Sequence, residues 1–210
     1  MSARHSEPTR SQPAASVRRL QRLQWGALVF VLLGAGLCWL GFVANPEQFF
    51  RSYLLAFLSW IGLSLGCLSL PMLPHLAGGA WGALILRLLE AGAGLLPLMA
   101  LAGMPLLWHL PIVYPWARPA SVAADALLQH KMPYLNGPFF TQRAVGYFVV
   151  WSLLGLLLPY WARRLDRLTE PAAARPLRRR LQLWSAGGLV LHALAVTFAS
   201  IDWIMSLEPA

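Results

Sequence analysis

Five long apolar runs dominate this sequence, and each is close to the length of a membrane-spanning helix. A helix needs about 20 apolar residues to cross the hydrocarbon core of a bilayer. The sequence also holds ten Trp, a residue that collects where hydrocarbon meets lipid head groups. We therefore predict an all-α integral membrane protein with a bundle of about five transmembrane helices. The predicted helices cover residues 25–43, 49–70, 81–110, 139–161 and 181–204.

The composition excludes a soluble domain. Hydrophobic residues make up 58% of the chain and charged residues 12%, against roughly 25% charged residues in an ordinary soluble protein. The formal net charge of +9 could indicate nucleic-acid binding. However, a nucleic-acid-binding protein needs a basic face on a folded domain, whereas the basic residues here gather between apolar runs.

Two arginine clusters predict the orientation of the chain. Five Arg precede the first apolar run, and seven lie between the fourth and the fifth. Because basic residues concentrate in cytoplasmic segments, we predict a cytoplasmic N-terminal tail over residues 1–22 and a cytoplasmic Arg-rich loop over 162–180. The transmembrane domain then covers residues 23–210, with an outer loop over 111–138.

The third run and the outer loop are both unusually long. The run over 81–110 exceeds one span, so it must tilt, kink or protrude, and Pro97 and Pro105 supply kink points. The outer loop is not of low complexity, and its middle could form a short helix on the membrane surface. Long ordered loops are often functional.

Glu90, His192 and Asp202 are ionisable residues inside or at the ends of apolar runs, where charge is costly and each group needs a partner or a function. Glu90 is either paired with Arg87 near the membrane interface or a protonatable carboxyl on a proton path. His192 is either hydrogen-bonded to a neighbouring helix or a rung of a proton relay. Asp202 is either a boundary residue or the next rung of that relay.

The outer loop offers a second candidate site. His130, Lys131, Tyr134 and Asn136 could line a polar pocket at the membrane surface. The alternative is that they serve loop structure and partner contacts. We predict no bound metal: Cys38 and Cys67 have no CxxC spacing and no nearby His.

Haem is also not expected, because a membrane b-type haem takes two His at matching depth. His192 is central in its helix, whereas His75 and His109 lie at helix ends. The chain shows no nucleophile elbow, phosphate loop or HExxH motif.

Several short motifs together resemble one known family. They are SYLLAF at 52–57, HLAGGAWG at 75–82, RLLEA at 87–91, LPLMA at 96–100, YPWA at 114–117, YLN at 134–136, PFF at 138–140 and DWIMSLEP at 202–209. Over residues 25–209 the chain resembles the second of the two NrfD-like membrane subunits of bacterial alternative complex III. That family is related to the membrane subunits of polysulfide reductase.

The resemblance implies a subunit of a quinol:cytochrome c oxidoreductase in the bacterial inner membrane. Such complexes pass electrons from membrane quinol through Fe–S clusters and haem c. The partners implied are a sister NrfD-like subunit, an Fe–S or molybdopterin-like subunit and haem c subunits. The second NrfD-like subunit itself is expected to bind no cofactor and not to be catalytic alone. It is suspected of proton conduction, for which the motifs indicate Glu90, His192 and Asp202.

The chain departs from this family in length. Family members resemble a chain of about ten helices in two bundles, and here the sequence stops just after SLEP. We therefore expect the first half of a larger subunit. Two other functions stay open: a transporter or channel, in which kinked helices and buried charge are common, and a structural anchor that docks extrinsic redox subunits through the outer loop.

Overall fold

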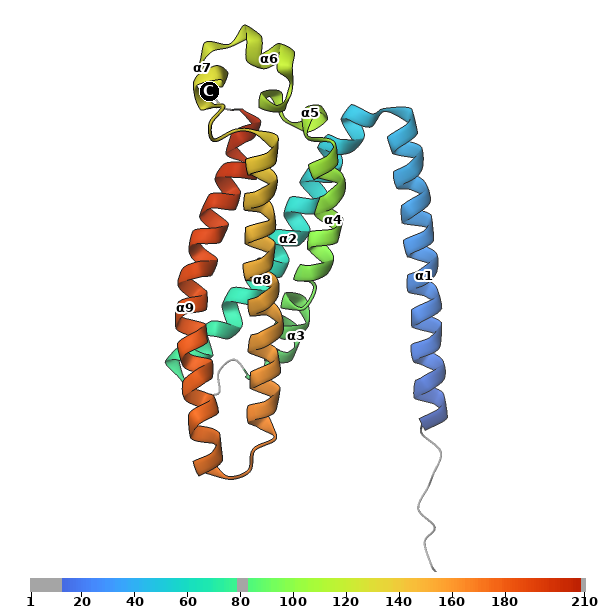
Figure 1. The fold of residues 1–210 in the computed structure, drawn as a ribbon. Coiled ribbons are helices and arrows are strands. Elements are labelled where there is room, and N and C mark those ends of the chain that lie inside the picture. Colours follow the sequence, from blue (N-terminus) through green and yellow to red (C-terminus); the bar gives the residue numbers. More distant parts are fainter. Residues whose placement is uncertain (1–12, 79–82, 209–210) are drawn as a thin grey trace, which may run out of the picture. The chain divides into compact units, whose positions relative to one another are not determined.

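The computed structural model describes residues 13–78 and 83–208 of the chain, and all regular structure in them is helical (Figure 1). Five helical segments there are long and apolar enough to cross a membrane, which confirms an all-α, multi-pass membrane protein. These segments are Gln21–Ala44, Pro46–Ala77, Ile85–Trp108, Gly137–Asp166 and Pro171–Leu207.

The chain divides into two compact units, residues 1–49 and 50–210. The first holds α1 (Pro13–Ala44) and the first turn of α2 (Pro46–Ala77). Asn45 separates the two helices, and its side-chain oxygen accepts a hydrogen bond from the Gln48 N–H at 3.1 Å, an N-terminal cap. Residues 1–12 of the expected basic tail lie outside the described residues, and the rest of that tail belongs to α1.

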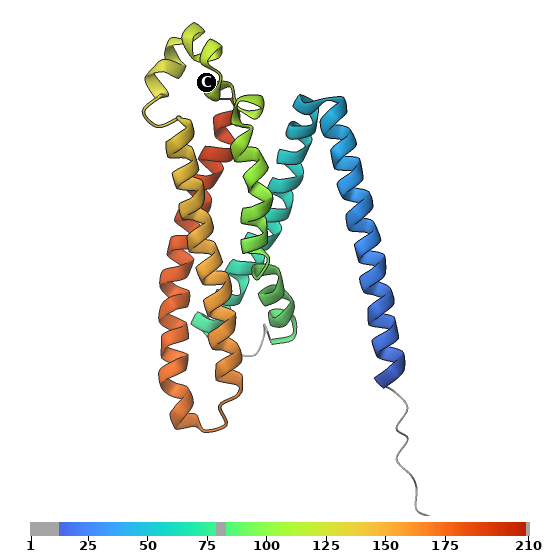
Figure 2. The ribbon, with the colours of Figure 1, turned by 45° about the vertical axis from the view of Figure 1, so that its right-hand side comes forward.

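The second unit packs four spans together. α8 (Gly137–Asp166) runs beside α9 (Pro171–Trp203) and also contacts α3 (Ala83–Ala93) and α4 (Leu96–Trp108), as Figures 1 and 2 show. α2 joins through Phe57, whose ring lies 6.5 Å from that of Phe148 and 6.0 Å from that of Trp203. Trp151, fully buried, completes this aromatic core.

The third span is interrupted just before Pro97, one of the two prolines expected to bend it. α3 ends at Ala93 and α4 begins at Leu96, so the break falls at Gly94 and Leu95. Pro97 follows in the first turn of α4, where its missing N–H costs nothing. Pro105 stays inside α4 without ending it. Residues 81 and 82 of the expected helix lie outside the described residues.

The segment expected as an Arg-rich loop is mostly helical. α8 continues to Asp166 and α9 begins at Pro171, which leaves only residues 167–170 as a connection. Arginine is a good helix former, and a proline in the first turn favours a helix start. The arginines therefore extend both helices beyond their apolar parts.

Between α4 and α8, residues 110–136 form a compact segment that we call the cap segment. It contains α5 (Leu110–Val113), the 3₁₀ turn η1 (Pro115–Ala117), α6 (Pro119–Ala124) and α7 (Ala126–Lys131). It lies at the opposite end of the second unit from the α8–α9 connection (Figures 1 and 2). The Arg118 guanidinium donates to the carbonyl oxygens of Pro111 and Ile112 at 2.6 and 2.7 Å, which folds the segment onto itself.

Candidate functional site

Asp202 lies at the end of α9 in a closed cluster of hydrogen bonds. Its side chain is only 1% exposed. Arg143 of α8 donates from Nη2 to Oδ1 and from Nε to Oδ2, both at 2.8 Å. The Tyr147 hydroxyl donates to Oδ2 at 2.7 Å. Arg143 and Tyr147 are four residues apart and so share one face of α8, and together they bind both carboxylate oxygens.

Arg143 also reaches the cap segment. Its guanidinium lies 4.0 Å from the centre of the Tyr134 ring and 4.4 Å from that of Phe139, distances typical of cation–π contacts. Its Nη1 donates to the Tyr134 carbonyl oxygen at 3.1 Å. Burial and the nearby negative charge of Asp202 both raise the pKa of the Tyr134 phenol, so it stays neutral and stacks on the cation.

A second bond fastens the cap segment to α9. The buried Tyr114 hydroxyl donates to the Trp203 carbonyl oxygen at 3.2 Å, and its ring packs against Trp116 and Phe140. Burial first, and the charge of Asp202 second, raise the pKa of the Tyr114 phenol. The neutral phenol therefore remains a hydrogen-bond donor across the accessible pH range.

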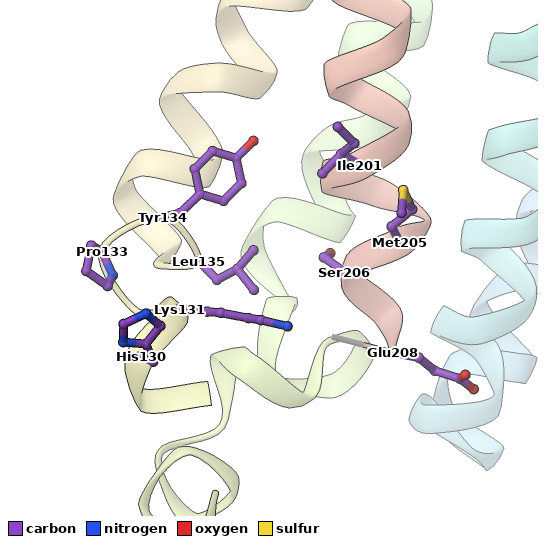
Figure 3. A pocket seen from close by; sticks show the side chains of 9 residues that line it. All are labelled: His130, Lys131, Pro133, Tyr134, Leu135, Ile201, Met205, Ser206 and Glu208. Atoms are coloured by element: carbon purple, nitrogen blue, oxygen red, sulfur yellow. The ribbon is translucent and has the colours of Figure 1, made fainter. Parts of the chain in front are cut away.

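A hollow of about 460 Å³ lies between the cap segment and residues 201–208, and Tyr134 belongs both to its lining and to the surroundings of Arg143 (Figure 3). His130, Lys131 and Tyr134 of the cap segment line it opposite Met205 and Ser206. The Ser206 hydroxyl donates to the carbonyl oxygen of Asp202, so the wall of the hollow and the ion pair are connected.

Of the four polar cap residues predicted as a pocket, the structure brings three to this hollow. Asn136 instead caps α8: its side-chain oxygen accepts from the Phe139 N–H at 2.9 Å, and its nitrogen donates to the carbonyl oxygens of Met132 and Pro133. Asn136 lines a different hollow, between the cap segment and the end of α4.

Glu90 lies at the other end of the second unit. Its Oε2 is 3.3 Å from Nη1 of Arg87, and Nη2 of Arg87 is 2.5 Å from Oδ2 of Asp166 on α8. The Arg87–Glu90 pair is therefore present, but Arg87 is 56% exposed and Glu90 only 7%. The other carboxylate oxygen, Oε1, is buried without a hydrogen-bond partner in the described part of the chain.

A small cavity of about 10 Å³ separates Glu90 from His75, and Leu68 and Leu158 also line it. That volume is about what one water molecule needs. The Nδ1 of His75 lies 3.1 Å from the hydroxyl of Ser185 on α9. Glu90, His75 and Ser185 thus form a short polar series that joins α3, α2 and α9.

His192 lies on the same buried face of α9 as Ser185 and Asp202. Its Nδ1 is buried and has no partner among the described residues, so the hydrogen bond to a neighbouring helix that we considered is not formed by this nitrogen. His192 and Asp202 are ten residues apart, about 15 Å along a helix. Ser185 and His192 are about 10 Å apart by the same measure. Direct proton transfer across these gaps is excluded.

The sequence did not indicate Arg143, Tyr147 or the pairing of His75 with Ser185. Arg143 could have been noticed, because it is a cation within the first two turns of an apolar helix and needs a partner there. Nothing in the sequence, however, points to a partner 59 positions away. The His75–Ser185 contact spans 110 positions and leaves no local signal either.

Among the described residues, no three His, Cys, Asp or Glu side chains are close enough to hold a metal ion. A comparison with models of known protein families and with curated proteins finds no match. The second unit thus holds two different sites: a buried carboxyl, one oxygen of which has no hydrogen-bond partner among the described residues, next to a cavity the size of one water molecule, and a closed ion pair that holds the cap segment.

Proposed function

We propose that the chain is a membrane subunit of a quinol-oxidising respiratory complex of the alternative complex III type, in which it supports quinol:cytochrome c electron transfer and conducts protons. The motif resemblance supports the complex. The observation that carries proton conduction is the buried Oε1 of Glu90, which lacks a partner among the described residues and lies at the same cavity as His75.

Glu90 has the geometry of a proton carrier at the mouth of a half-path. The exposed pair of Arg87 and Asp166 links it to one end of the second unit. One water in the cavity would reach His75, whose Nδ1 meets Ser185. Carboxyl groups and imidazoles inside a membrane protein commonly form such relays. Protons that continue to His192 would need further water.

The proposed setting follows from the arginine distribution and the resemblance. The N-terminus and the α8–α9 connection face the cytoplasm of a bacterial inner membrane. The half-path through Glu90 then opens to the cytoplasm, and the cap segment faces outward. A sister NrfD-like subunit, an Fe–S or molybdopterin-like subunit and haem c subunits are the proposed partners, and quinol is oxidised within the complex rather than by this chain alone.

One observation favours a second function, that of a structural anchor. The cap segment is fastened to the bundle by Arg143 and Tyr114, so it offers a rigid platform for extrinsic redox subunits. In this alternative Glu90 has no part in proton movement. The hollow around Phe57, Phe148 and Trp203 has an almost wholly apolar lining and gives a transporter or channel no comparable support.

The experiment compares E90Q with E170Q in the assembled complex, reconstituted in vesicles. Glu170 is exposed and its side chain makes no capping bond, so it controls for loss of one carboxylate. We expect E90Q to lower the number of protons moved per quinol oxidised while uncoupled quinol oxidation continues, and E170Q to change neither. Unchanged proton movement in E90Q would reject conduction and leave the anchor function.

A further inference from the structure

The exposed face of α8 is apolar along most of its length and becomes basic toward the C-terminal end of the helix. Val149, Leu153 and Leu156 are each about half exposed and lie along one side of the helix. One turn further, Tyr160 is 56% exposed, and Arg163, Arg164 and Arg167 follow on the same side. An apolar stripe therefore leads directly into a group of three arginines.

These arginines frame a hollow of about 600 Å³, together with Leu156 and Tyr160. The Nε of Arg163 donates to the Pro159 carbonyl oxygen at 3.1 Å, which fixes one wall of the hollow against the helix. No carboxylate of the described chain lines it. Asp166, on the same turn, is bound to Arg87, and none of the three arginines forms an ion pair within the described residues.

The surroundings add to the positive charge. Residues 162–180 contain seven arginines and two acidic residues, a formal surplus of five positive charges. Trp161 packs against Trp184 at a ring distance of 5.5 Å, and Arg180 lies over the Trp161 ring. Tryptophan and tyrosine are typical of the depth at which head groups lie. We therefore expect the hollow to lie at the level of lipid phosphates.

We propose that this hollow binds the phosphate of an anionic phospholipid, with the acyl chains along Leu156, Leu153 and Val149. One guanidinium group can donate two parallel hydrogen bonds to a phosphate. Basic pockets at the cytoplasmic side of transmembrane helices bind anionic head groups. The apolar stripe distinguishes a lipid from a free phosphate, because only a lipid has chains to cover it. If the arginines served only to orient the chain in the membrane, they would not need to line a hollow that lacks carboxylates.

The test uses the purified full chain in neutral detergent and native mass spectrometry with added phosphatidylglycerol or phosphatidylcholine. The variant R163Q/R164Q/R167Q removes the three guanidinium groups that line the hollow. The matched control R175Q/R178Q/R179Q removes the same charge from exposed positions of α9 at the same end. Glutamine and arginine have similar helix propensity. The milder R164Q/R167Q variant keeps the Arg163 bond and serves if the first variant unfolds.

We expect the wild type and the α9 control to retain phosphatidylglycerol in preference to phosphatidylcholine. The α8 variants should bind it about tenfold more weakly or worse, since each interfacial arginine contributes about a factor of five. Equal weakening in both triple variants would mean that overall charge alone attracts the lipid, and would overturn the site. Absence of lipid preference in the wild type, or displacement of the lipid by millimolar inorganic phosphate, would overturn it as well.

Discussion

Two carboxyl groups are buried in the second unit, and both meet an arginine. Asp202 meets Arg143 across two helices, with side chains 1% and 12% exposed. Glu90 meets Arg87 one turn away on its own helix, and that arginine is 56% exposed. Both oxygens of Asp202 accept hydrogen bonds, whereas one oxygen of Glu90 accepts none in the described residues.

The difference indicates a structural role for Asp202 and a functional role for Glu90. A fully bonded, desolvated ion pair is disrupted at great cost when one partner is lost, so the Asp202 cluster suits the joining of α8, α9 and the cap segment. A buried carboxyl with one oxygen unbonded among the described residues, beside a cavity the size of one water molecule, fits the proton-carrying role that we propose for Glu90. On sequence grounds Glu90 is either an Arg87 partner or part of a proton path, and Asp202 is either a boundary residue or part of a proton relay. Their surroundings favour different roles for them.

The largest expected effect comes from removing the arginine of the closed pair. R143Q leaves the Asp202 carboxylate buried without its cation, and we expect a loss of about 3–5 kcal/mol in the free energy of unfolding. R87Q removes an exposed partner and should cost no more than about 1 kcal/mol. Denaturant unfolding of the purified chain in detergent measures both.

The double variant R143Q/D202N separates the cost of the unpaired charge from other effects of R143Q. Without the buried charge, much of the stability lost in R143Q should return, because the neutral amide needs no cation. Equal losses in the free energy of unfolding for R143Q and R87Q would mean that the two pairs are energetically alike. The distinction between a structural Asp202 and a functional Glu90 would then be wrong.

A smaller loss is expected when Tyr147 becomes Phe. This change removes the phenol that donates to Asp202 Oδ2 at 2.7 Å, and a hydrogen bond to a charged group contributes about 1.5–3 kcal/mol. Y160F is the matched control, since Tyr160 is exposed on the same helix. The same unfolding measurement applies. If Y147F and Y160F behaved alike, Tyr147 would have no part in holding Asp202.

An effect similar to or somewhat smaller than that of Y147F is predicted at the Glu90 end, through the packing of α8 against the break in the third span. A Cβ on Gly155 would lie 2.8 Å from the Ala93 carbonyl oxygen, so G155A must push α8 away. We expect a loss of about 1–3 kcal/mol. G146A, which meets nothing within 4 Å on the same helix, should instead stabilise by about 0.5–1 kcal/mol through helix propensity.

G155A also tests whether the loss of this contact affects Glu90 but not Asp202. Opening this contact should make Glu90 react faster with a carbodiimide that modifies carboxyl groups, while Asp202 stays protected by Arg143 and Tyr147. Faster modification of Asp202 alone would show that the two sites do not depend on separate packing.

Local chemistry explains which elements the sequence could predict. Helix length and apolar content belong to each segment alone, so the five spans and their approximate bounds follow from hydropathy. The exceptions are informative. The third span breaks at Gly94 and Leu95, just before Pro97, which has no N–H to bond the Ala93 carbonyl oxygen. The tertiary structure adds that this carbonyl packs closely against Gly155 of α8, 62 positions away in the chain. The arginines of residues 162–180 extend the helices because arginine is itself a good helix former.

The candidate residues divide in the same manner. That Glu90, His192 and Asp202 are ionisable groups in apolar helices follows from the sequence, because the cost of charge in lipid depends on the segment alone. Which of them are satisfied depends on the packing of the helices. Arg143 reaches Asp202 across 59 positions, and no described residue reaches Oε1 of Glu90. Hydrogen bonds between helices depend on which helix faces pack together, and the spacing of residues along the chain does not show this.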